Sequence, residues 1–318
     1  MTKKKKEIEI LSRIYDIDMF EILENEEPDF LMKHTNDESY FGVEVTEYYY
    51  NETNARMDNV AGYSLSLLDG GDFIHKSDRN ELEVTDITLI SEVGEENVVR
   101  AIASNIPSTN EFIGRLIENI RTKNKKYQKY DKTLRHINLI VNNTEHFLSF
   151  HERKYLFHIL FIPEFVEVIK ESNFNEIFLI TETINNTRLK IPLKLTLFIS
   201  EYMLYQDAFF EYYGSKAELI TPKEYYFQLI EYLVGVGFSS FRVRNDKNET
   251  EFFFSDYSIV INENEGGLKI RDWNGRSNNF EIEIFEANGK YIDNLFLDYF
   301  RKFKSEFMFA SEIGFEIM

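Results

Sequence analysis

Two short runs of sequence decide the fold of this chain: Pro28-Asp29-Phe30-Leu31-Met32-Lys33-His34 and Tyr40-Phe41-Gly42-Val43-Glu44-Val45-Thr46. Both runs are rich in aromatic and β-branched residues, which favour β-strands. The polar segment between them, residues 34–39, is typical of a turn. We therefore expect an antiparallel hairpin over residues 29–46.

The register of this hairpin predicts a site. A hairpin centred between Asn36 and Asp37 pairs residues whose numbers sum to 73, so Asp29 lies opposite Glu44. Directly opposed residues have Cβ atoms about 4.5–5.5 Å apart. Two carboxylates that close repel each other unless a positive charge lies between them. A divalent metal such as magnesium, which takes oxygen ligands, would supply that charge.

Composition narrows the classes of function. The 318 residues include 36 Lys+Arg and 55 Asp+Glu, which gives a formal net charge of −19. That charge argues against nucleic-acid binding by the whole surface, although a local basic patch could still contact phosphates. The absence of cysteine excludes disulfides, thiolate zinc sites and cysteine nucleophiles. No run reaches the roughly 18 apolar residues of a membrane span and no secretory signal is evident, so we expect a cytoplasmic protein without a membrane partner.

The rest of the chain predicts helices and strands in alternation. An amphipathic helix is expected over residues 3–15, and a short helix or irregular strand over 18–27. Further along we expect a helix over 51–59, a loop over 62–80, an extended run over 87–93, a helix from Ser108, a strand over 137–142, a helix over 155–171 and a strand over 176–181. Residues 189–213 are apolar and receive no assignment. This order favours a mixed sheet with covered faces.

The character of the sequence changes near residues 215–221. Thr221-Pro222 begins a predicted helix that ends near Val234. Four or five strand-like runs follow, over residues 239–244, 251–254, 257–262, 267–271 and 280–285, and a closing helix is expected over 296–309. The predicted fold class is α/β (α+β), with one domain over residues 1–215 and a smaller C-terminal α+β domain over 216–318.

The order of a helix, Pro28-Asp29-Phe30 at a strand start, and Glu44-Val45-Thr46 on the neighbouring strand resembles the PD-(D/E)xK nuclease superfamily. The resemblance covers residues 1–145 and implies a restriction-endonuclease-like αβββαβ core. It implies that Asp29 and Glu44 bind Mg²⁺ (or Mn²⁺), with the Val45 carbonyl as a further ligand. The first helix of such proteins often adds a glutamate, for which we select Glu9, with Glu7, Glu21 and Glu24 as alternatives.

One position departs from the superfamily pattern. Thr46 stands where the superfamily usually has a catalytic lysine that assists the attacking water. Period-two alternation puts Thr46 on the same face as Glu44, so the position fits but the chemistry differs. The substitutes that could supply a charge are Lys33, Arg56, Lys76 and His75, and none of them stands out.

The function implied by the resemblance is metal-dependent hydrolysis of a phosphodiester in nucleic acid, with DNA preferred over RNA. By analogy alone, such an enzyme could serve restriction or defence against foreign DNA. The basic segment over residues 121–135 could bind the nucleic-acid backbone, chiefly through Lys123, Lys125, Lys126 and Lys129. The same lysines could instead be the solvated, dipole-stabilising end of a helix.

Two other readings stay open. Thr46 and the charge of −19 are also consistent with an inactive nuclease-like fold that acts as a nucleic-acid- or protein-binding regulatory module. A third reading is an interaction protein of an unrelated α+β fold. In the nuclease hypothesis the C-terminal domain could bind a protein partner, sense a signal or form a homodimer.

Overall fold

The computed structural model describes residues 3–35, 39–90, 94, 96–104, 107–143, 162–182, 188–220, 222–236, 241–246, 249–254, 257–262, 268–272, 283–285 and 293–306. The α-helices are α1 (Lys3–Ser12), α2 (Glu52–Asn59), α3 (Tyr63–Leu68), α4 (Asp78–Glu81), α5 (Thr109–Lys126), α7 (Pro163–Glu171), α8 (Leu193–Tyr213), α9 (Pro222–Gly235) and α10 (Asn294–Glu306). The 3₁₀ helices are η1 (Ile17–Met19), η2 (Tyr127–Lys129) and η4 (Gly214–Leu219).

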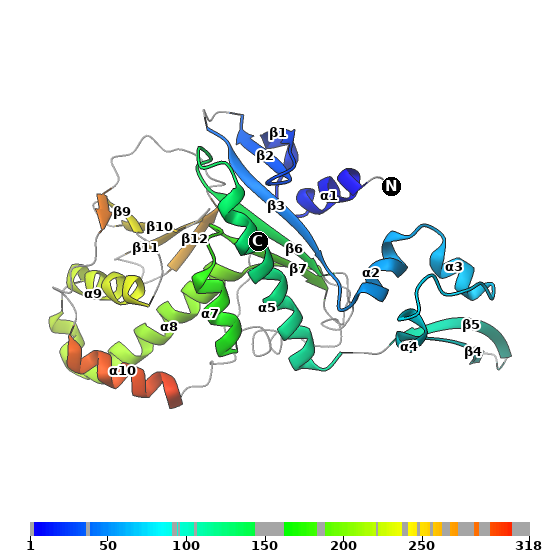
Figure 1. Cartoon of the computed structure of the whole chain (residues 1–318). Helices are drawn as coiled ribbons and strands as arrows, with labels where there is room; N and C mark the ends of the chain where they lie inside the picture. Colours follow the sequence, from blue (N-terminus) through cyan, green and yellow to red (C-terminus); the bar gives the residue numbers. More distant parts are fainter. Residues whose placement is uncertain are drawn as a thin grey trace.

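The strands form three sheets (Figure 1). The main sheet contains β1 (Phe20–Glu24), β2 (Phe30–His34), β3 (Phe41–Tyr48), β6 (Ile137–Asn143), β7 (Ile177–Glu182) and β8 (Arg188–Pro192), in the order β1-β2-β3-β6-β7-β8. A two-stranded sheet pairs β4 (Leu82–Ile90) with β5 (Glu96–Ser104). The third sheet contains β9 (Phe241–Asp246), β10 (Glu249–Phe254), β11 (Tyr257–Asn262), β12 (Leu268–Asp272) and β13 (Glu283–Phe285).

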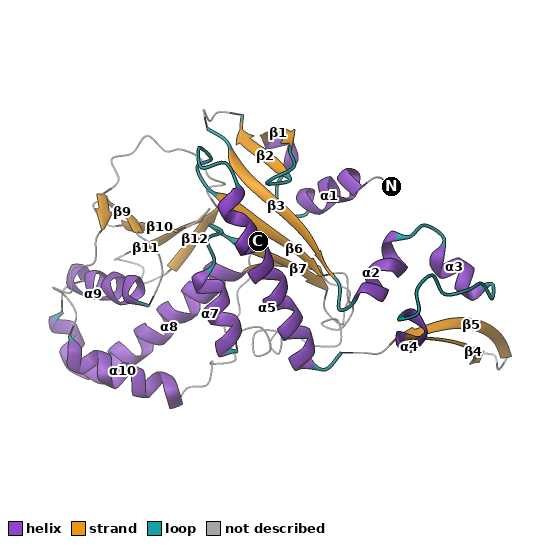
Figure 2. Cartoon of the chain, viewed as in Figure 1, coloured by secondary structure: helices purple, strands orange, loops and turns teal. Residues whose placement is uncertain are grey.

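The main sheet is mixed, as predicted. Strands β1, β2 and β3 are antiparallel, β6 and β7 run parallel to β3, and β8 is antiparallel to β7. Strands β6 and β7 are buried along nearly their whole length, as expected for strands covered on both faces. Figure 2 shows the helices that flank this sheet. The prediction of a mixed sheet flanked by helices is confirmed.

Alternation along β3 separates the two faces of the sheet. The Tyr48 hydroxyl donates to the Phe112 carbonyl of α5, at 3.1 Å, so even-numbered residues of β3 face α5. Glu47 forms an ion pair with Lys6 of α1, at 2.6 Å, so odd-numbered residues face α1. The strand between the two helices therefore directs Glu44 toward α5.

The register of the hairpin is confirmed. Strands β2 and β3 pair Phe30 with Val43, Leu31 with Gly42 and Met32 with Phe41, and the numbers of each pair sum to 73. Residues 36–38 of the predicted turn lie outside the described residues. A Cβ atom at Gly42 would lie only 2.6 Å from Cγ of Pro28, so glycine is needed for this close approach. Pro28 packs over β3 and thereby brings Asp29 beside it.

Several other predicted elements are confirmed. Helix α2 begins after Asn51, whose side chain accepts a hydrogen bond from the Asn54 N–H at 2.8 Å. Helix α5 begins where it was predicted, after Ser108, and Ser108 and Glu111 form a capping box at its start. Helix α7 begins at Pro163, and the predicted helical residues 155–161 lie outside the described residues. Residues 18–27 contain η1 and β1, and β1 adds an antiparallel strand to the hairpin.

The predicted loop over residues 62–80 is wrong in part, because it contains α3 and α4. Tyr63 and Leu67 of α3 pack with Leu82 of β4 in a small core that is separate from the main one. Beside this core, the fully buried Asp78 accepts hydrogen bonds from Thr53 and Tyr63 and pairs with Arg56. Burial alone would favour protonation, but these bonds hold the pKa of the Asp78 carboxyl well below its usual range.

An insertion between β3 and α5 contains α2, α3, α4, β4 and β5. The hairpin of β4 and β5 extends from it, away from the main sheet (Figure 1). The faces of the hairpin are mostly exposed beyond its first few residues. The insertion therefore has its own packing and is joined to the main sheet through the end of β3 and the start of α5.

The apolar residues 189–213, left unassigned from sequence, divide into β8 and α8. The fully buried Glu176 fixes the start of α8, because its carboxylate accepts the N–H groups of Lys194 at 2.8 Å and Leu195 at 3.1 Å. The first N–H groups of a helix have no partner within the helix, so this carboxylate acts as a cap supplied by the residue just before β7. Such a cap depends on tertiary structure and leaves no local signal.

Helices α9 and α10 pack against α8 through aromatic rings. The Tyr205 ring lies 5.1 Å from the rings of both Tyr232 and Phe296. This packing continues the main hydrophobic core across residue 215. The predicted strand-like runs are confirmed as strands β9 to β13, which form an antiparallel sheet. Residues 239–240, 267 and 280–282 of those runs lie outside the described residues. The division into domains 1–215 and 216–318 stays a prediction.

None of the described helices combines the length and the apolar character needed to cross a membrane.

The buried cap on α8 yields a stability prediction. We expect Glu176→Ala to lower the free energy of unfolding by about 2–4 kcal/mol, because it leaves buried N–H groups unpaired. Glu176→Gln retains one acceptor oxygen and should cost less. Urea unfolding followed by circular dichroism measures both, with the exposed Glu167→Ala as the control. A Glu176→Ala variant as stable as the Glu167→Ala control would show that α8 does not depend on this cap.

Candidate functional site

Asp29 lies within electrostatic range of two other buried carboxylates, Glu44 and Glu7. Asp29 precedes β2, Glu44 lies in the middle of β3, and Glu7 lies on α1. Their exposed fractions are 8%, 5% and 5%, which is unusual for ionisable side chains. Buried carboxylates require compensating charges or hydrogen bonds, so the partners of these three define the site.

Asp29 is held against the backbone of β3. Its Oδ2 atom accepts a hydrogen bond from the Val45 N–H at 2.9 Å. In an extended strand the N–H and C=O of one residue point to the same side, so the Val45 carbonyl is directed toward Asp29 as well. Burial, followed by the negative charges of Glu44 and Glu7, raises the pKa of Asp29, while the Val45 N–H and Lys4 act in the opposite direction. The carboxylates are therefore close enough to repel each other.

Glu44 has a lysine partner from α5. The Lys123 ammonium lies 2.7 Å from Glu44 Oε1, and both side chains are largely buried. The hydroxyl of Tyr130 also faces this carboxylate, and burial together with the Glu44 charge raises the pKa of Tyr130. Neither the Tyr130 hydroxyl nor the second oxygen of Glu44, Oε2, has a hydrogen bond of ordinary geometry, although both atoms are buried.

Asp29 and Glu7 share a second lysine. The Lys4 ammonium of α1 lies 3.0 Å from Glu7 Oε2 and 3.4 Å from Asp29 Oδ1. It also donates to the backbone carbonyl of Asn25 at 3.0 Å. Burial opposes the charged form of Lys4, but hydrogen bonds and charges from Glu7 and Asp29 raise its pKa overall. The site thus contains three carboxylates and two ammonium groups.

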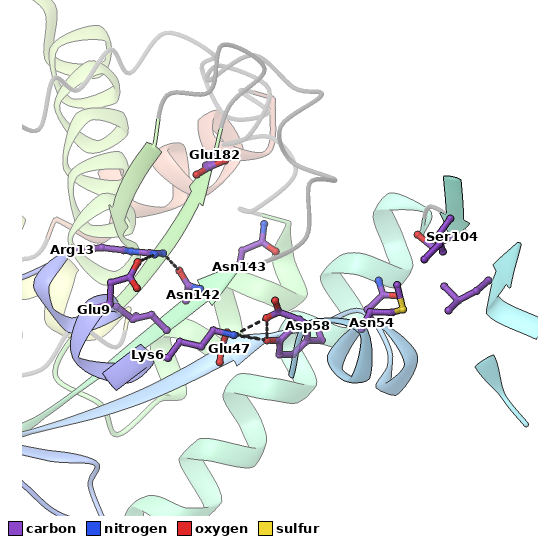
Figure 3. Close-up of a pocket in the computed structure, with 15 residues that line it drawn as sticks. Lys6, Glu9, Arg13, Glu47, Asn54, Asp58, Ser104, Asn142, Asn143 and Glu182 are labelled. Atoms are coloured by element: carbon purple, nitrogen blue, oxygen red, sulfur yellow. Dashed lines mark hydrogen bonds and ion pairs between the residues drawn. The ribbon is translucent and has the colours of Figure 1, made fainter. Parts of the chain in front are cut away.

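Glu9, our selection from the sequence, lies elsewhere. Its carboxylate pairs with Arg13 at 2.7 Å, and Arg13 in turn donates to Asn142 at 3.0 Å (Figure 3). These residues line a cavity of about 630 Å³ that also contains the Lys6–Glu47 ion pair. The member of α1 that the structure brings to Asp29 is Glu7, which we weighed as an alternative.

The substitutes considered for the missing lysine are engaged elsewhere or exposed. Lys33 pairs with Glu21 across β1 and β2 at 2.8 Å. Arg56 is bound to Asp78 of the insertion. His75 contacts the Ser77 hydroxyl at 2.7 Å, and Lys76 is exposed. Glu24, an alternative to Glu9 as the additional metal-binding glutamate, is exposed on β1. Thr46 is half-buried on β3, on the same face as Glu44.

The basic segment divides into one buried lysine and several exposed ones. Lys125, Lys126 and Lys129 are exposed at the end of α5 and in η2, and they form no ion pair with a described residue. Lys123 differs, because it turns inward to Glu44. The structure therefore places Lys123 with the carboxylates and leaves the other three on the surface.

A groove leads to Lys123. We call it the α5 groove; its volume is about 590 Å³. It is lined by Arg115, Glu118, Asn119, Thr122 and Lys123 of α5 and by Glu47, Tyr48, Tyr49, Tyr50, Asn51, Glu52, Thr53, Ala55, Ser77 and Glu81. Acidic side chains outnumber basic ones along this lining. Its field alone would not attract a phosphate.

The fit of the site to a divalent cation depends on its donor set. The part of the chain that the structure describes contains no group of three or more acidic or histidine side chains that could hold a metal ion. A smaller set fits: the carboxylates of Asp29 and Glu44 and the Val45 carbonyl supply hard oxygen donors, as Mg²⁺ prefers. The buried Glu44 Oε2, without an ordinary hydrogen bond, is the observation that favours a cation here.

Sequence reasoning missed two residues of the site and misplaced a third. Lys4 belongs to a lysine run typical of a solvated terminus, and its spacing to Glu7 was its only local signal. Nothing near Tyr130 in the sequence connects it with Glu44. Lys123 was assigned to the nucleic-acid backbone, and its contact with Glu44 spans 79 positions.

No protein-family model matches the chain, and no curated protein or solved structure is significantly similar to it. The geometry of the site and the stated resemblance are therefore the support for its function.

The raised pKa of Asp29 predicts a pH-dependent stability difference. Because the folded-state pKa lies above the unfolded-state value, the penalty for ionised Asp29 is absent at low pH and complete above the folded-state pKa. We expect Asp29→Asn to raise the Tm at pH 7.5, by about 2–4 °C for each kcal/mol of relieved repulsion. The difference should vanish near pH 4.

Differential scanning calorimetry at both pH values measures this effect. The exposed Asp72→Asn removes the same charge from the surface and serves as the control. A Tm that falls at pH 7.5 in Asp29→Asn would mean that the Lys4 and Val45 contacts outweigh the repulsion by Glu44.

Proposed function

We propose that the chain is a metal-dependent nuclease that hydrolyses phosphodiester bonds, with DNA as the preferred substrate. The observation that supports this most directly is the contact of Lys123 with Glu44 at 2.7 Å. It provides an ammonium group on the face of β3 where the resemblance places a lysine and where the chain has Thr46. In this proposal Lys123 of α5 supplies the positive charge that Thr46 cannot.

The order of elements also supports the proposal. The chain runs α1, β1, β2, β3, α5, β6, and the strands lie in the order β1-β2-β3-β6, with β6 parallel to β3. This is the αβββαβ order that the resemblance to the PD-(D/E)xK superfamily implies, interrupted by the insertion between β3 and α5. Membership in that superfamily is part of the proposal.

Each residue of the site has a role in this proposal. Asp29, Glu44 and the Val45 carbonyl would hold Mg²⁺ or Mn²⁺. The bound ion would supply a lower pKa for water and charge stabilisation at the leaving oxygen. Lys123 would hold a positive charge beside the attacked phosphate and stabilise the negative charge that develops there. Glu7 would orient Lys4 and add negative potential behind Asp29.

Nucleic acid would contact the exposed end of α5. Lys125, Lys126 and Lys129 carry exposed positive charges that can pair with backbone phosphates. The α5 groove extends from Lys123 along the helix and also exposes Tyr50, whose ring could stack on a base. The proposal also includes a role in defence against foreign DNA and a homodimer or protein partner bound through residues 216–318.

The second candidate is an inactive nuclease-like fold that binds nucleic acid or protein. Two observations favour it: Asp29 and Glu44 already have lysine partners, and the described residues contain no cluster of three metal-binding side chains. Cleavage and binding assays on plasmid, linear DNA and RNA, with Mg²⁺ or Mn²⁺ present, distinguish the two candidates. Cleavage that is lost in both Asp29→Ala and Glu44→Ala supports the nuclease. Binding without cleavage, unchanged in both variants, supports the module.

The role of Lys123 gives a quantitative prediction. We expect Lys123→Met to lower the cleavage rate at saturating metal by about 100-fold or more, because it removes the charge that stabilises the transition state. The same change at the exposed Lys216 of η4 should leave the rate within about twofold, since a distant surface charge is screened. Equal rates for the two variants would exclude a catalytic role for Lys123.

A positive charge placed at residue 46 of β3 should compensate for the loss of the Lys123 charge. In the Lys123→Met background, we expect Thr46→Lys to restore the cleavage rate by about tenfold or more, because residue 46 lies on the same face as Glu44. Thr46→Met in the same background is the matched control for side-chain length without charge. Restoration by both changes, or by neither, would contradict the exchange of roles between Lys123 and residue 46.

A further inference from the structure

The ammonium group of Lys4 is surrounded by oxygen atoms. It lies 3.0 Å from Glu7 Oε2, 3.0 Å from the Asn25 carbonyl, 3.3 Å from the Asp29 carbonyl and 3.4 Å from Asp29 Oδ1. The Phe30 ring lies 5.0 Å away and adds a cation–π contact. Four oxygen atoms around one positive charge form a cation site that the chain fills with its own side chain.

The neighbouring lysines of α1 behave differently. Lys3 pairs with the other oxygen of Glu7 at 3.3 Å, but 87% of its side chain is exposed. Lys5 is exposed and forms no ion pair with a described residue. Lys4 is thus the lysine of this run whose charge contacts Asp29 directly.

The charges of the site explain why this contact matters. Asp29, Glu44 and Glu7 contribute three negative charges, Lys4 and Lys123 contribute two positive ones, and the largely exposed Lys3 adds a third at Glu7. A divalent cation bound between Asp29 and Glu44 would lie close to the Lys4 ammonium. Like charges at that separation repel strongly in a partly buried site. Lys4 can move away, because a third of its flexible side chain, 34%, is already exposed.

We propose that Lys4 is a built-in counter-ion of the carboxylate site, which a divalent cation displaces from Asp29 when it binds. This inference rests on the proposed function, because it needs a divalent cation at Asp29 and Glu44. Lys4 keeps the carboxylates paired in the absence of metal and lowers the affinity of the site for metal. The metal concentration at which the site fills is thereby set by the first turn of α1.

Binding of Mn²⁺ alone tests the competition. Electron paramagnetic resonance of free Mn²⁺ gives the Kd for the wild-type protein, Lys4→Gln and Lys5→Gln. Both variants lose one charge from α1, so their difference reports the contact with Asp29 and not the net charge. We expect Lys4→Gln to lower the Kd about tenfold, which corresponds to about 1.4 kcal/mol. Lys5→Gln should change the Kd by less than about twofold.

The outcomes separate the two levels of inference. Wild-type and Lys4→Gln proteins that bind Mn²⁺ with equal Kd would overturn the role of Lys4 and leave the proposed function intact. Mn²⁺ binding to none of the three proteins would overturn the metal site itself, and the counter-ion with it. Mn²⁺ binding by Lys4→Gln alone would support the counter-ion role, because Lys4 would then exclude the cation from the wild-type site.

A measurement on the wild-type protein avoids any effect of substitution on folding. The reactivity of each lysine toward an amine-acetylating reagent is followed by mass spectrometry, with and without saturating Mn²⁺. We expect Lys4 to react several-fold faster when Mn²⁺ is present, because its ammonium has left Asp29, while Lys5 reacts at an unchanged rate. Unchanged reactivity of Lys4 in protein that binds Mn²⁺ would contradict the displacement.

Discussion

The structure around the hairpin depends on one electrostatic constraint: Asp29 and Glu44 are buried beside each other, and each needs a positive charge. Lys4 of α1 serves Asp29, and Lys123 of α5 serves Glu44. These helices lie on opposite faces of the main sheet. Removing either lysine would leave a buried carboxylate without its positive partner, so the packing of both helices stabilises the carboxylates.

The sequence was sufficient for the hairpin and its register, because strand alternation and turn position fix a local register. It was not sufficient for the partners of Asp29 and Glu44. Glu7 and Glu9 are two positions apart on one helix and so point in different directions, and only the packing of α1 selects Glu7. The contact of Lys123 with Glu44 requires α5 to pack across β3, which no local pattern encodes.

The same limit explains the elements that sequence patterns missed. Residues 62–80 contain turn signals, yet α3 forms there because Tyr63 and Leu67 are buried against β4. Residues 189–213 show neither the 3.6-residue period of an amphipathic helix nor the two-residue period of a strand, because α8 is buried on nearly all sides. The start of α8 is also not marked locally, since its cap is supplied by Glu176. In both segments tertiary burial outweighs local propensity. Where burial is one-sided, as in α5, the predicted helix is confirmed, and a local capping box marks its start.

The acidic character of the chain bears directly on how a nuclease of this kind would engage its substrate. With a net charge of −19 and an acidic lining in the α5 groove, the protein gains little long-range attraction for a polyanion. Screening restricts attraction to charges within about 8–10 Å, which leaves the exposed lysines at the end of α5 and in η2 and any cation that the carboxylates hold. A divalent cation that displaces Lys4 would raise the local positive charge at the point where a phosphate must approach. Nucleic-acid binding and metal binding would then be coupled, and the substrate would be recognised mainly by the metal-loaded site.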